Sequence, residues 1–499
     1  MTALVGIAAV LVAIVLYDIF QKKHAVVRNF PIIGHFRYLL ESVGPELRQY
    51  IVTSNDEERP FSRDERRWVY STAKRENSNF GFGTDNLLDS ASNYILIKHA
   101  AFPAQVPPQG DPPDYPLPCS KLLGGFRERE KRFRPRSLVN ISGMSFGSLS
   151  SSAVEALNKG AKLANCLQST GEGGLADCHL HGGELIWQIG TGYFGCRDGN
   201  GQFDLQRFKE GVEMHEIRAI EIKLSQGAKP GLGGVLPAAK ITPEIARIRG
   251  VPMARDCISP NRHTAFGDVD SMLDFVELLA SESGLPIGIK SAVGEIEFWR
   301  DLSRLTAETG RSVDFVTIDG GEGGTGAAPL TFTDHVALPF RLAFPRVYRE
   351  FALRDLHHRV VFIGSARLGL PANALHALSM GCDLINVGRE AMLAIGCIQA
   401  QRCHTGRCPT GVATQNAWLT RGLDPASKSV RAANYIVGMR RELTLLSRAC
   451  GVSGPGMVSP DHIEIMTEGS TVRPLREVIG YERNWGTHAA TFTDRDPNA

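Results

Sequence analysis

Short apolar runs alternate with longer amphipathic stretches over much of the chain. Stretches with the 3.6-residue period of helices lie at 270–283, 296–309 and 371–380. Strands that alternate with helices form a parallel sheet with crossover connections. The apolar runs, which have the length of buried strands, are 138–141, 185–189, 219–224, 287–289, 315–318, 360–363 and 384–387.

These runs lie between Ser137 and about Gln415, a span close to the usual length of a (β/α)8 barrel. Glycines follow almost every expected strand. A doubly wound sheet would instead carry one glycine-rich nucleotide loop near its first strand. We therefore predict an α/β fold, a (β/α)8 TIM barrel with a transmembrane helix before it and a helical extension after it.

The N-terminal residues 2–17 are uncharged and mostly apolar, and the first basic residues, Lys22 and Lys23, follow them. Such a run approaches the lower length limit of a membrane span, and positive charge after it places the remaining chain in the cytoplasm. We expect a single-pass anchor, with a peripheral helix or a cleaved signal as the alternatives. The expected division is 1–20 (anchor), 21–135 (a region packing on the barrel), 136–415 (barrel) and 416–499 (helical extension and tail).

The composition is that of a folded enzyme, with 43% hydrophobic and 22% charged residues. The formal net charge of +2 provides no field that attracts nucleic acid, so we expect no such partner. Of the ten cysteines, seven are scattered and are interpreted as small buried hydrophobes. The other three form a cluster.

Cys397, Cys403 and Cys408 fall within twelve residues, and Pro409 follows the last of them. Three clustered thiolates suit soft iron in an iron–sulfur cluster, and a cytosolic location disfavours disulfides. Zinc, with His404 as a fourth ligand, is an alternative. Three ligands favour a three-iron centre or a four-iron centre with an open corner, and the spacing does not decide between these two.

Glycine-containing loops follow the last two expected strands, at Gly364-Ser365 and Gly388-Arg389. In phosphate-binding barrels these loops present backbone N–H groups to the anion, and Arg389 could add a charged contact. Ordinary turns have the same composition, so the loops are weak evidence by themselves.

A lysine, Lys223, ends one expected strand, and the glycine-rich loop after it carries Gln226 and Lys229. Thr242-Pro243-Glu244 then has the pattern of a helix N-terminus, and this helix leads to Arg249. Such a cationic pocket suits an anionic substrate such as a dicarboxylate, although a salt-bridged loop is the alternative.

Two carboxylates stand among glycines. Glu172 lies within Gly171–Gly174 and Glu322 within Gly320–Gly324. Each could act as an acid–base group or contact the substrate.

Together these segments resemble the FMN-binding synthase domain of glutamate synthase, from about Ile141 to Gln415. The most specific match is 394–415, which is similar to that family's three-iron cluster segment. Further matches, in the same order as in the family, lie at 171–174, 226–231, 242–247 and 323–327.

The resemblance implies FMN at the barrel mouth and a 3Fe-4S cluster held by Cys397, Cys403 and Cys408. In the family reaction, ammonia condenses with 2-oxoglutarate and reduced flavin passes hydride to the resulting imine, while the cluster relays electrons from a donor such as ferredoxin or a membrane carrier. The implied flavin contacts are Met144 and Ser145 at the ring, Lys290 at its polar edge, and Gly364, Ser365, Gly388 and Arg389 at the phosphate.

The same resemblance implies a 2-oxo acid site built from Glu172, Lys223, Gln226, Lys229 and Arg249. Gln226, Lys229 and Arg249 would bind the substrate, and Glu172, Lys223 and Lys229 would act in catalysis. These roles describe an oxidoreductase acting on CH–NH2 donors.

The chain departs from the family at Leu232 and Val235, where typical relatives carry glutamate and glutamine. Unmatched polar contacts discriminate strongly between substrates, so the acid is open. The sequence contains no recognisable glutaminase or dinucleotide-binding unit, so we expect free ammonia or a separate glutaminase, and no direct reduction by NAD(P)H. Two alternatives stay open: a membrane-linked flavoenzyme that oxidises an amino or hydroxy acid, and a non-catalytic FMN and iron–sulfur electron-transfer subunit.

Overall fold

The computed structural model describes residues 2–43, 58–77, 79, 81–84, 86, 88, 91–467 and 471–487. Eight parallel strands form a closed barrel, and the last strand pairs back to the first, which confirms the predicted TIM barrel. In barrel order the strands are β2 (Val139–Ile141), β3 (Leu167–Ser169), β4 (Glu184–Ile189), β5 (Ile217–Lys223), β8 (Ile287–Ser291), β9 (Phe315–Asp319), β10 (Val361–Ser365) and β11 (Leu384–Val387).

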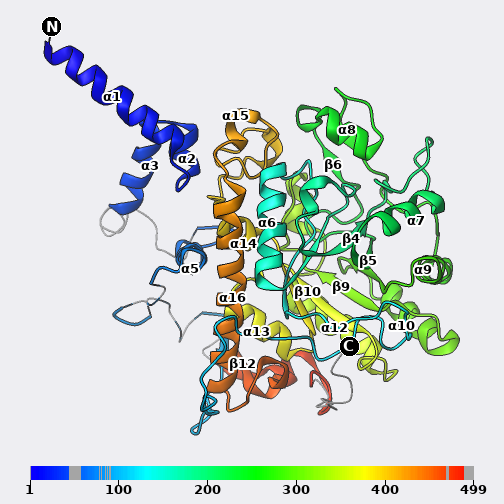
Figure 1. The fold of residues 1–499 in the computed structure, drawn as a ribbon. Helices are drawn as coiled ribbons and strands as arrows, with labels where there is room; N and C mark the ends of the chain where they lie inside the picture. The colour runs from blue at the N-terminus through cyan, green and yellow to red at the C-terminus, as the bar shows by residue number, and fades with distance from the viewer. Residues whose placement is uncertain are drawn as a thin grey trace.

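The strands are buried along nearly their whole length because helices cover the outside of the barrel (Figure 1). Only β3 was not predicted, because its sequence Leu-Gln-Ser has one apolar residue. Its Gln168 instead accepts a hydrogen bond from Asn158 at 2.7 Å. The helices between strands are α6 (Ser151–Ala164), α7 (Leu205–Met214), α9 (Val269–Ser283), α10 (Glu297–Thr309), α11 (Leu330–His335), α12 (Phe340–Ala352) and α13 (Pro371–Ser379).

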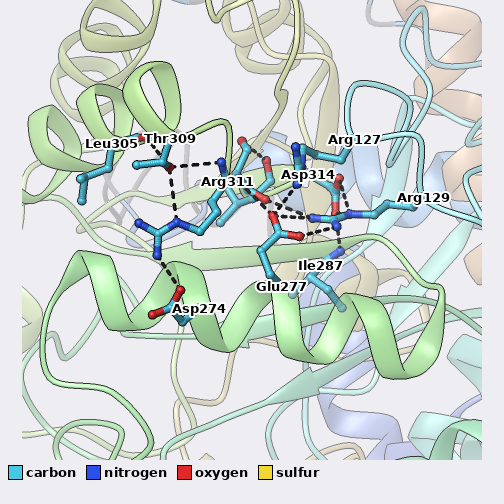
Figure 2. Close-up of polar contacts among 11 residues, drawn as sticks. Arg127, Arg129, Asp274, Glu277, Ile287, Leu305, Thr309, Arg311 and Asp314 are labelled. Atoms are coloured by element: carbon cyan, nitrogen blue, oxygen red, sulfur yellow. Dashed lines mark hydrogen bonds and ion pairs between the residues drawn. The ribbon is translucent and has the colours of Figure 1, made fainter.

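An ion network lies at the end of the barrel opposite the strands' carboxyl ends (Figure 2). The Arg129 guanidinium lies 2.7 Å from Glu277 and 3.0 Å from Asp314. Asp314 also accepts the backbone N–H of Ile287, the first residue of β8, at 2.8 Å. Burial raises the pKa of Asp314 to about 6, although Arg129 opposes this. The network ties α9 to the starts of β8 and β9.

The C-terminal extension is dominated by α16 (Pro425–Ala449), which runs beside α6 (Figure 1). The two helices approach closely at Gly160, where a Cβ atom would lie 2.6 Å from that of Ala432. From the N-terminal side, α5 (Arg63–Lys74) packs on α16 and on α14 (Arg389–Ala394). A capping box between Ser62 and Glu65 starts α5.

A small antiparallel sheet joins the N-terminal and C-terminal parts of the chain. Its strands are β1 (Ile95–Ile97), β12 (Ile463–Met466) and β13 (Val472–Pro474). The remaining elements are a two-stranded ribbon of β6 (Val235–Leu236) and β7 (Cys257–Ile258), and the helices α8 (Pro243–Arg249), α15 (Ala417–Thr420) and α17 (Leu475–Ile479).

Three helices at the N-terminus, α1 (Thr2–Phe20), α2 (Ala25–Asn29) and α3 (Ile33–Ser42), form a separate projection (Figure 1). The apolar α1 extends away from the barrel and is mostly exposed. Its length and composition would allow it to cross a membrane, a property that signal sequences share.

Candidate active site

A cavity of about 630 Å³ opens at the carboxyl ends of the barrel strands. This size is within the range of small-molecule and cofactor sites. The site residues predicted from the sequence line it, except Gly364 and Glu322; Gly364 lies inside β10 and pairs with both neighbouring strands. The lining members are Met144, Ser145, Glu172, Lys223, Gln226, Lys229, Arg249, Lys290, Ser365, Gly388, Arg389, Cys397, Cys403 and Cys408.

Glu172, after β3, and Lys223, at the end of β5, form an ion pair in this cavity. The Lys223 Nζ atom lies 2.8 Å from Glu172 Oε1. Burial opposes ionisation of the carboxyl, but Lys223 outweighs it and holds the pKa of Glu172 below its usual range. Glycines make room for the carboxylate, since a Cβ atom at Gly190 or Gly234 would lie 2.6 Å from one of its oxygens. Glu172 is therefore a carboxylate at neutral pH.

The loop after β5 is fixed to the loop after β9. The Gln226 amide accepts from Lys223 at 2.5 Å and donates to the Thr325 hydroxyl at 3.0 Å. Lys229 donates to the carbonyl of Ala327 at 2.7 Å. Burial lowers the pKa of Lys229 to about 8, and the nearby Glu172 partly offsets this. Both loops thus present polar groups on one wall of the cavity.

Arg249 comes from α8, which begins with Thr242 as N-cap, as the sequence indicated. Its guanidinium donates to the carbonyl of Phe146 at 3.0 Å and lies over the ring of Phe194, 5.0 Å from the centroid. A Cβ atom at Gly147 would come within 3.2 Å of the same guanidinium. Backbone and ring therefore hold Arg249 in place at the cavity wall.

Lys290, at the end of β8, has acidic partners that the sequence did not reveal. Its Nζ atom lies 3.5 Å from Asp319, which also accepts the backbone N–H of Gly227 at 3.0 Å. Burial disfavours the Lys290 ammonium, but Asp319 and the buried Glu221 raise its pKa above the usual value. Lys290 is therefore protonated at neutral pH. These partners, Glu221 and Asp319, lie on β5 and β9, the two strands beside β8. The alternation of side-chain directions along these strands was the sequence signal that could have revealed them.

Ser365, Gly388 and Arg389 meet where β10 and β11, the seventh and eighth barrel strands, end. This is the usual phosphate corner of such barrels. The Phe61 ring lies between two guanidinium groups there, 5.2 Å from that of Arg367 and 5.2 Å from that of Arg389. Arg367 also pairs with Glu65 at 2.9 Å, and Arg389 and the Gly388 backbone border the cavity at this corner.

A segment before α5 covers the space between this corner and the cysteine loop. Gln399 accepts the backbone N–H of Phe61 at 3.0 Å and donates to its carbonyl at 3.0 Å. From α5, the Tyr70 hydroxyl donates to the carbonyl of Cys397 at 2.8 Å. These contacts link positions more than 300 residues apart, and the sequence pattern gave no sign of them.

Cys397, Cys403 and Cys408 border the same cavity. Burial raises the pKa of Cys397 to about 12, and the nearby thiols of Cys408 and Cys403 add to this effect. Among the described residues, one group of three potential metal ligands has all its ligand atoms within 4.8 Å of one another. That group lies at 355–358 and does not include the three cysteines. The three sulfur atoms therefore do not all lie within 4.8 Å of one another.

A buried lysine from the β6–α8 loop reaches the cysteine loop. Lys240 donates to the carbonyl of Ser148 at 2.6 Å and to that of Cys403 at 3.3 Å. Its charge would offset the negative charge of clustered thiolates. Lys240 was not among the site residues predicted from the sequence.

Glu322 does not have the role that its glycine-rich surroundings indicated. Its carboxylate accepts the backbone N–H of Phe340, at 2.9 Å from one oxygen, and so caps the start of α12. This structural contact explains its position, and it is not among the residues that line the cavity.

Of the two positions that depart from the family pattern, one borders the cavity. Val235, in the β6–β7 ribbon, lines the cavity, and Leu232 stands in the loop before it. Each side chain is 37% exposed. The ribbon therefore gives the entrance an apolar edge.

Comparison with known proteins agrees with this geometry. Residues 123–453 match the family model described as the conserved region in glutamate synthase. The chain is 37% identical to the glutamate synthase large subunit-like protein YerD of Bacillus subtilis, over 92% of this chain and 93% of that protein. It is 34% identical to the archaeal glutamate synthase [NADPH] of Methanocaldococcus jannaschii, over 68% of this chain and 64% of that protein.

Among solved structures, the flavin-binding domain of baker's yeast flavocytochrome b2 is 14% identical, with a TM-score of 0.44, covering 93% of this chain and 96% of that one. The family model extends over both the barrel and α16. On the strength of that match and of the two sequence relatives, this chain belongs to the glutamate synthase family.

Proposed function

We propose that this protein is a glutamate synthase-like oxidoreductase that uses FMN and an iron–sulfur cluster to reduce a 2-imino acid. The expected substrates are 2-oxoglutarate and ammonia, which together with two electrons and protons give glutamate and water. One observation carries the proposal. One cavity is lined by the carboxylate of Glu172, by three basic side chains (Lys223, Lys229 and Arg249), by the phosphate corner and by the three thiols.

The phosphate corner fits the FMN phosphate, because Arg389 supplies charge there and the Gly388 backbone borders the cavity, while Arg367 beside it is paired with Glu65. Met144 and Ser145 would lie beside the flavin ring, and Lys290 would face its polar edge. Lys290 is suited to this because Asp319 keeps it protonated.

Bound FMN supplies hydride transfer and the cluster supplies single electrons. The protein's own groups bind and orient the acid. Arg249, Lys229 and Gln226 would hold the carboxylates of the 2-oxo acid, since two of them are fixed cations on one wall. The Glu172–Lys223 pair would hold a proton between its members and exchange it with the substrate as water leaves.

The thiols of Cys397, Cys403 and Cys408 would hold the cluster, and a three-iron centre matches their number. Their sulfur atoms do not all lie within 4.8 Å of one another, which favours a cluster over a single zinc ion. Lys240 would stabilise the negative charge of the ligated thiolates.

Electrons would come from ferredoxin or a membrane carrier, and ammonia would be free or come from a separate glutaminase. NADPH appears in the name of the archaeal relative, of which this chain covers only 64%. We further propose that α1 anchors the protein in a membrane with the barrel on the cytoplasmic side, because basic residues follow the apolar helix.

Flavin reoxidation tests the substrate. The full-length protein, purified without oxygen and photoreduced, should reoxidise rapidly only when 2-oxoglutarate and ammonia are both added. The Lys229→Met variant should lose this response, and Lys209→Met, on the exposed face of α7, should keep it. A normal flavin spectrum without reoxidation would exclude 2-oxoglutarate as the substrate and direct the search to acids that suit the apolar edge at Val235.

Iron analysis tests the cluster separately. Cys408→Ser should lower the iron and sulfide content and abolish the cluster's electron paramagnetic resonance signal while flavin remains bound. Cys382→Ala, at a buried cysteine away from the cavity, is the control and should keep the full signal. Zinc in place of iron in the unmodified protein would contradict the proposal.

A further inference from the structure

The short helix α3 presents an apolar stripe to the outside. Ile33, Phe36 and Leu40 recur at helical spacing and are 72%, 63% and 59% exposed, and Leu39 and Val43 widen the stripe. Isolated exposed apolar residues are common, but a continuous stripe of this kind marks a contact surface.

The opposite face of α3 packs on the protein. Gly34 lies against α2 so closely that a Cβ atom there would be 2.7 Å from the Cα atom of Val27. The Tyr38 ring lies against that of His24, with the centroids 4.4 Å apart. The orientation of α3 is therefore fixed, and its apolar stripe faces away from the rest of the molecule.

A buried carboxylate ties the start of α3 to the end of α1. Asp18 is fully buried, and it accepts the backbone N–H of Ile32 at 2.9 Å and contacts His35 Nε2 at 2.8 Å. An ionisable group is costly in hydrocarbon, so this pair belongs where a span ends. The first turn of α3, which contacts Asp18, then lies at the depth of the membrane where the α1 span ends.

The direction of α3 is consistent with that depth. In Figure 1, α3 runs across the axis of α1 from its lower end, and the barrel lies beyond that end. The basic residues Lys22, Lys23 and Arg28 follow α1, and Arg37 stands on α3. Cations beside an apolar stripe are typical of helices that lie in an anionic membrane surface.

We propose that α3 is an interfacial helix, with its apolar stripe inserted in the lipid leaflet that faces the barrel. This inference rests on the proposed membrane span of α1. A span alone leaves the protein free to rotate and tilt about one axis, whereas a second insertion beside it removes that freedom.

The attachment also fixes the cysteine loop relative to the membrane. From the end of α2, the Asn29 amide donates to the carbonyls of Pro409 and Leu419 at 3.0 and 2.9 Å, and the Trp418 indole donates to the Asn29 carbonyl at 3.0 Å. Pro409 follows Cys408 directly. Insertion of α3 therefore holds this loop close to the lipid headgroups.

Photo-crosslinking in vesicles tests the placement. A benzoylphenylalanine residue would replace Phe36, Val12 in α1, or Glu41 on the polar face of α3, one at a time in the full-length protein. The vesicles would contain phosphatidylcholine and phosphatidylglycerol. Irradiation should give lipid adducts at positions 36 and 12 at least tenfold above those at position 41, measured by mass spectrometry.

The outcomes separate the two proposals. Lipid adducts at position 12 but not at 36 would overturn the interfacial helix and leave the anchor standing. Adducts at neither position would overturn both. Crosslinks from position 36 to a second copy of the chain, or to another protein, would make the stripe a protein interface and overturn the lipid assignment.

Discussion

The Lys223 ammonium lies 2.8 Å from a carboxylate oxygen of Glu172, and both side chains line the cavity at the barrel mouth. The ammonium of Lys223 holds the pKa of Glu172 below its usual range, although burial alone would favour the neutral carboxyl. This pair, which contacts the cavity, can exchange a proton with a bound substrate.

Replacing Glu172 with glutamine should therefore reduce turnover strongly. The amide has nearly the same shape but cannot hold the proton, so we expect a loss of about 100-fold or more with flavin content unchanged. Glu308→Gln, on the exposed surface of α10, is the control and should have no effect. Steady-state rates with flavin quantified by absorbance make the comparison, and full activity in Glu172→Gln would show that the carboxylate has no catalytic role.

Substrate affinity should fall at alkaline pH. Burial lowers the pKa of Lys229 to about 8, so the side chain is a cation below this pH and neutral above it. Because the cation is what attracts a carboxylate, the KM for the 2-oxo acid should rise as pH increases through 8. Lys229→Arg, which stays charged, should flatten this rise, and an identical profile in both proteins would assign the dependence to another group.

Arg389→Met should weaken binding of FMN but not of riboflavin. The arginine faces the phosphate corner, and losing one charge-assisted contact of about 1.5–3 kcal/mol corresponds to a 10- to 150-fold higher Kd. Riboflavin lacks the phosphate, so its Kd should not change. Titration of the flavin-free protein, followed by fluorescence quenching, measures both values. Equal weakening of both flavins would mean that the substitution disturbs the fold.

The ion network at the base of the barrel should contribute unequally to stability. The Arg129 side chain is 9% exposed and pairs with both Glu277 and Asp314. The Arg127 side chain is 30% exposed and pairs with Glu277 but not with Asp314. Arg129→Met leaves the buried Asp314 without its cation, while Glu277 keeps Arg127, and should lower the free energy of unfolding by about 3–5 kcal/mol. Arg127→Met should cost at most about 1 kcal/mol. Urea unfolding compares the two, and equal effects would refute the distinction.

Much of the fold could be predicted from local patterns. The apolar runs located all the barrel strands but one, because a strand covered on both faces must be almost continuously apolar. The exception, β3, is three residues long, and its Gln168 is satisfied by Asn158 from α6. A local pattern contains no information on such a partner.

The candidate site was predictable where its residues stand in short motifs, as at Cys397 to Cys408 and at Thr242-Pro243. The site was harder to predict where a residue's role depends on partners that are distant in the sequence. The segment at Phe61 meets Gln399 across 338 positions, and Asp319 reaches Lys290 only because β8 and β9 are neighbours. Glu322 shows the converse, since its motif was correct for a glycine-rich turn but its carboxylate serves as a helix cap.

The contact of Asn29 with Leu419 imposes an order on biogenesis. The two residues are 390 positions apart, and a ribosome that adds about 5–20 residues per second needs about 20–80 s to make the second after the first. During that time the N-terminal helices exist without their docking site. The projection thus docks late in synthesis, after the polypeptide of the barrel has been made.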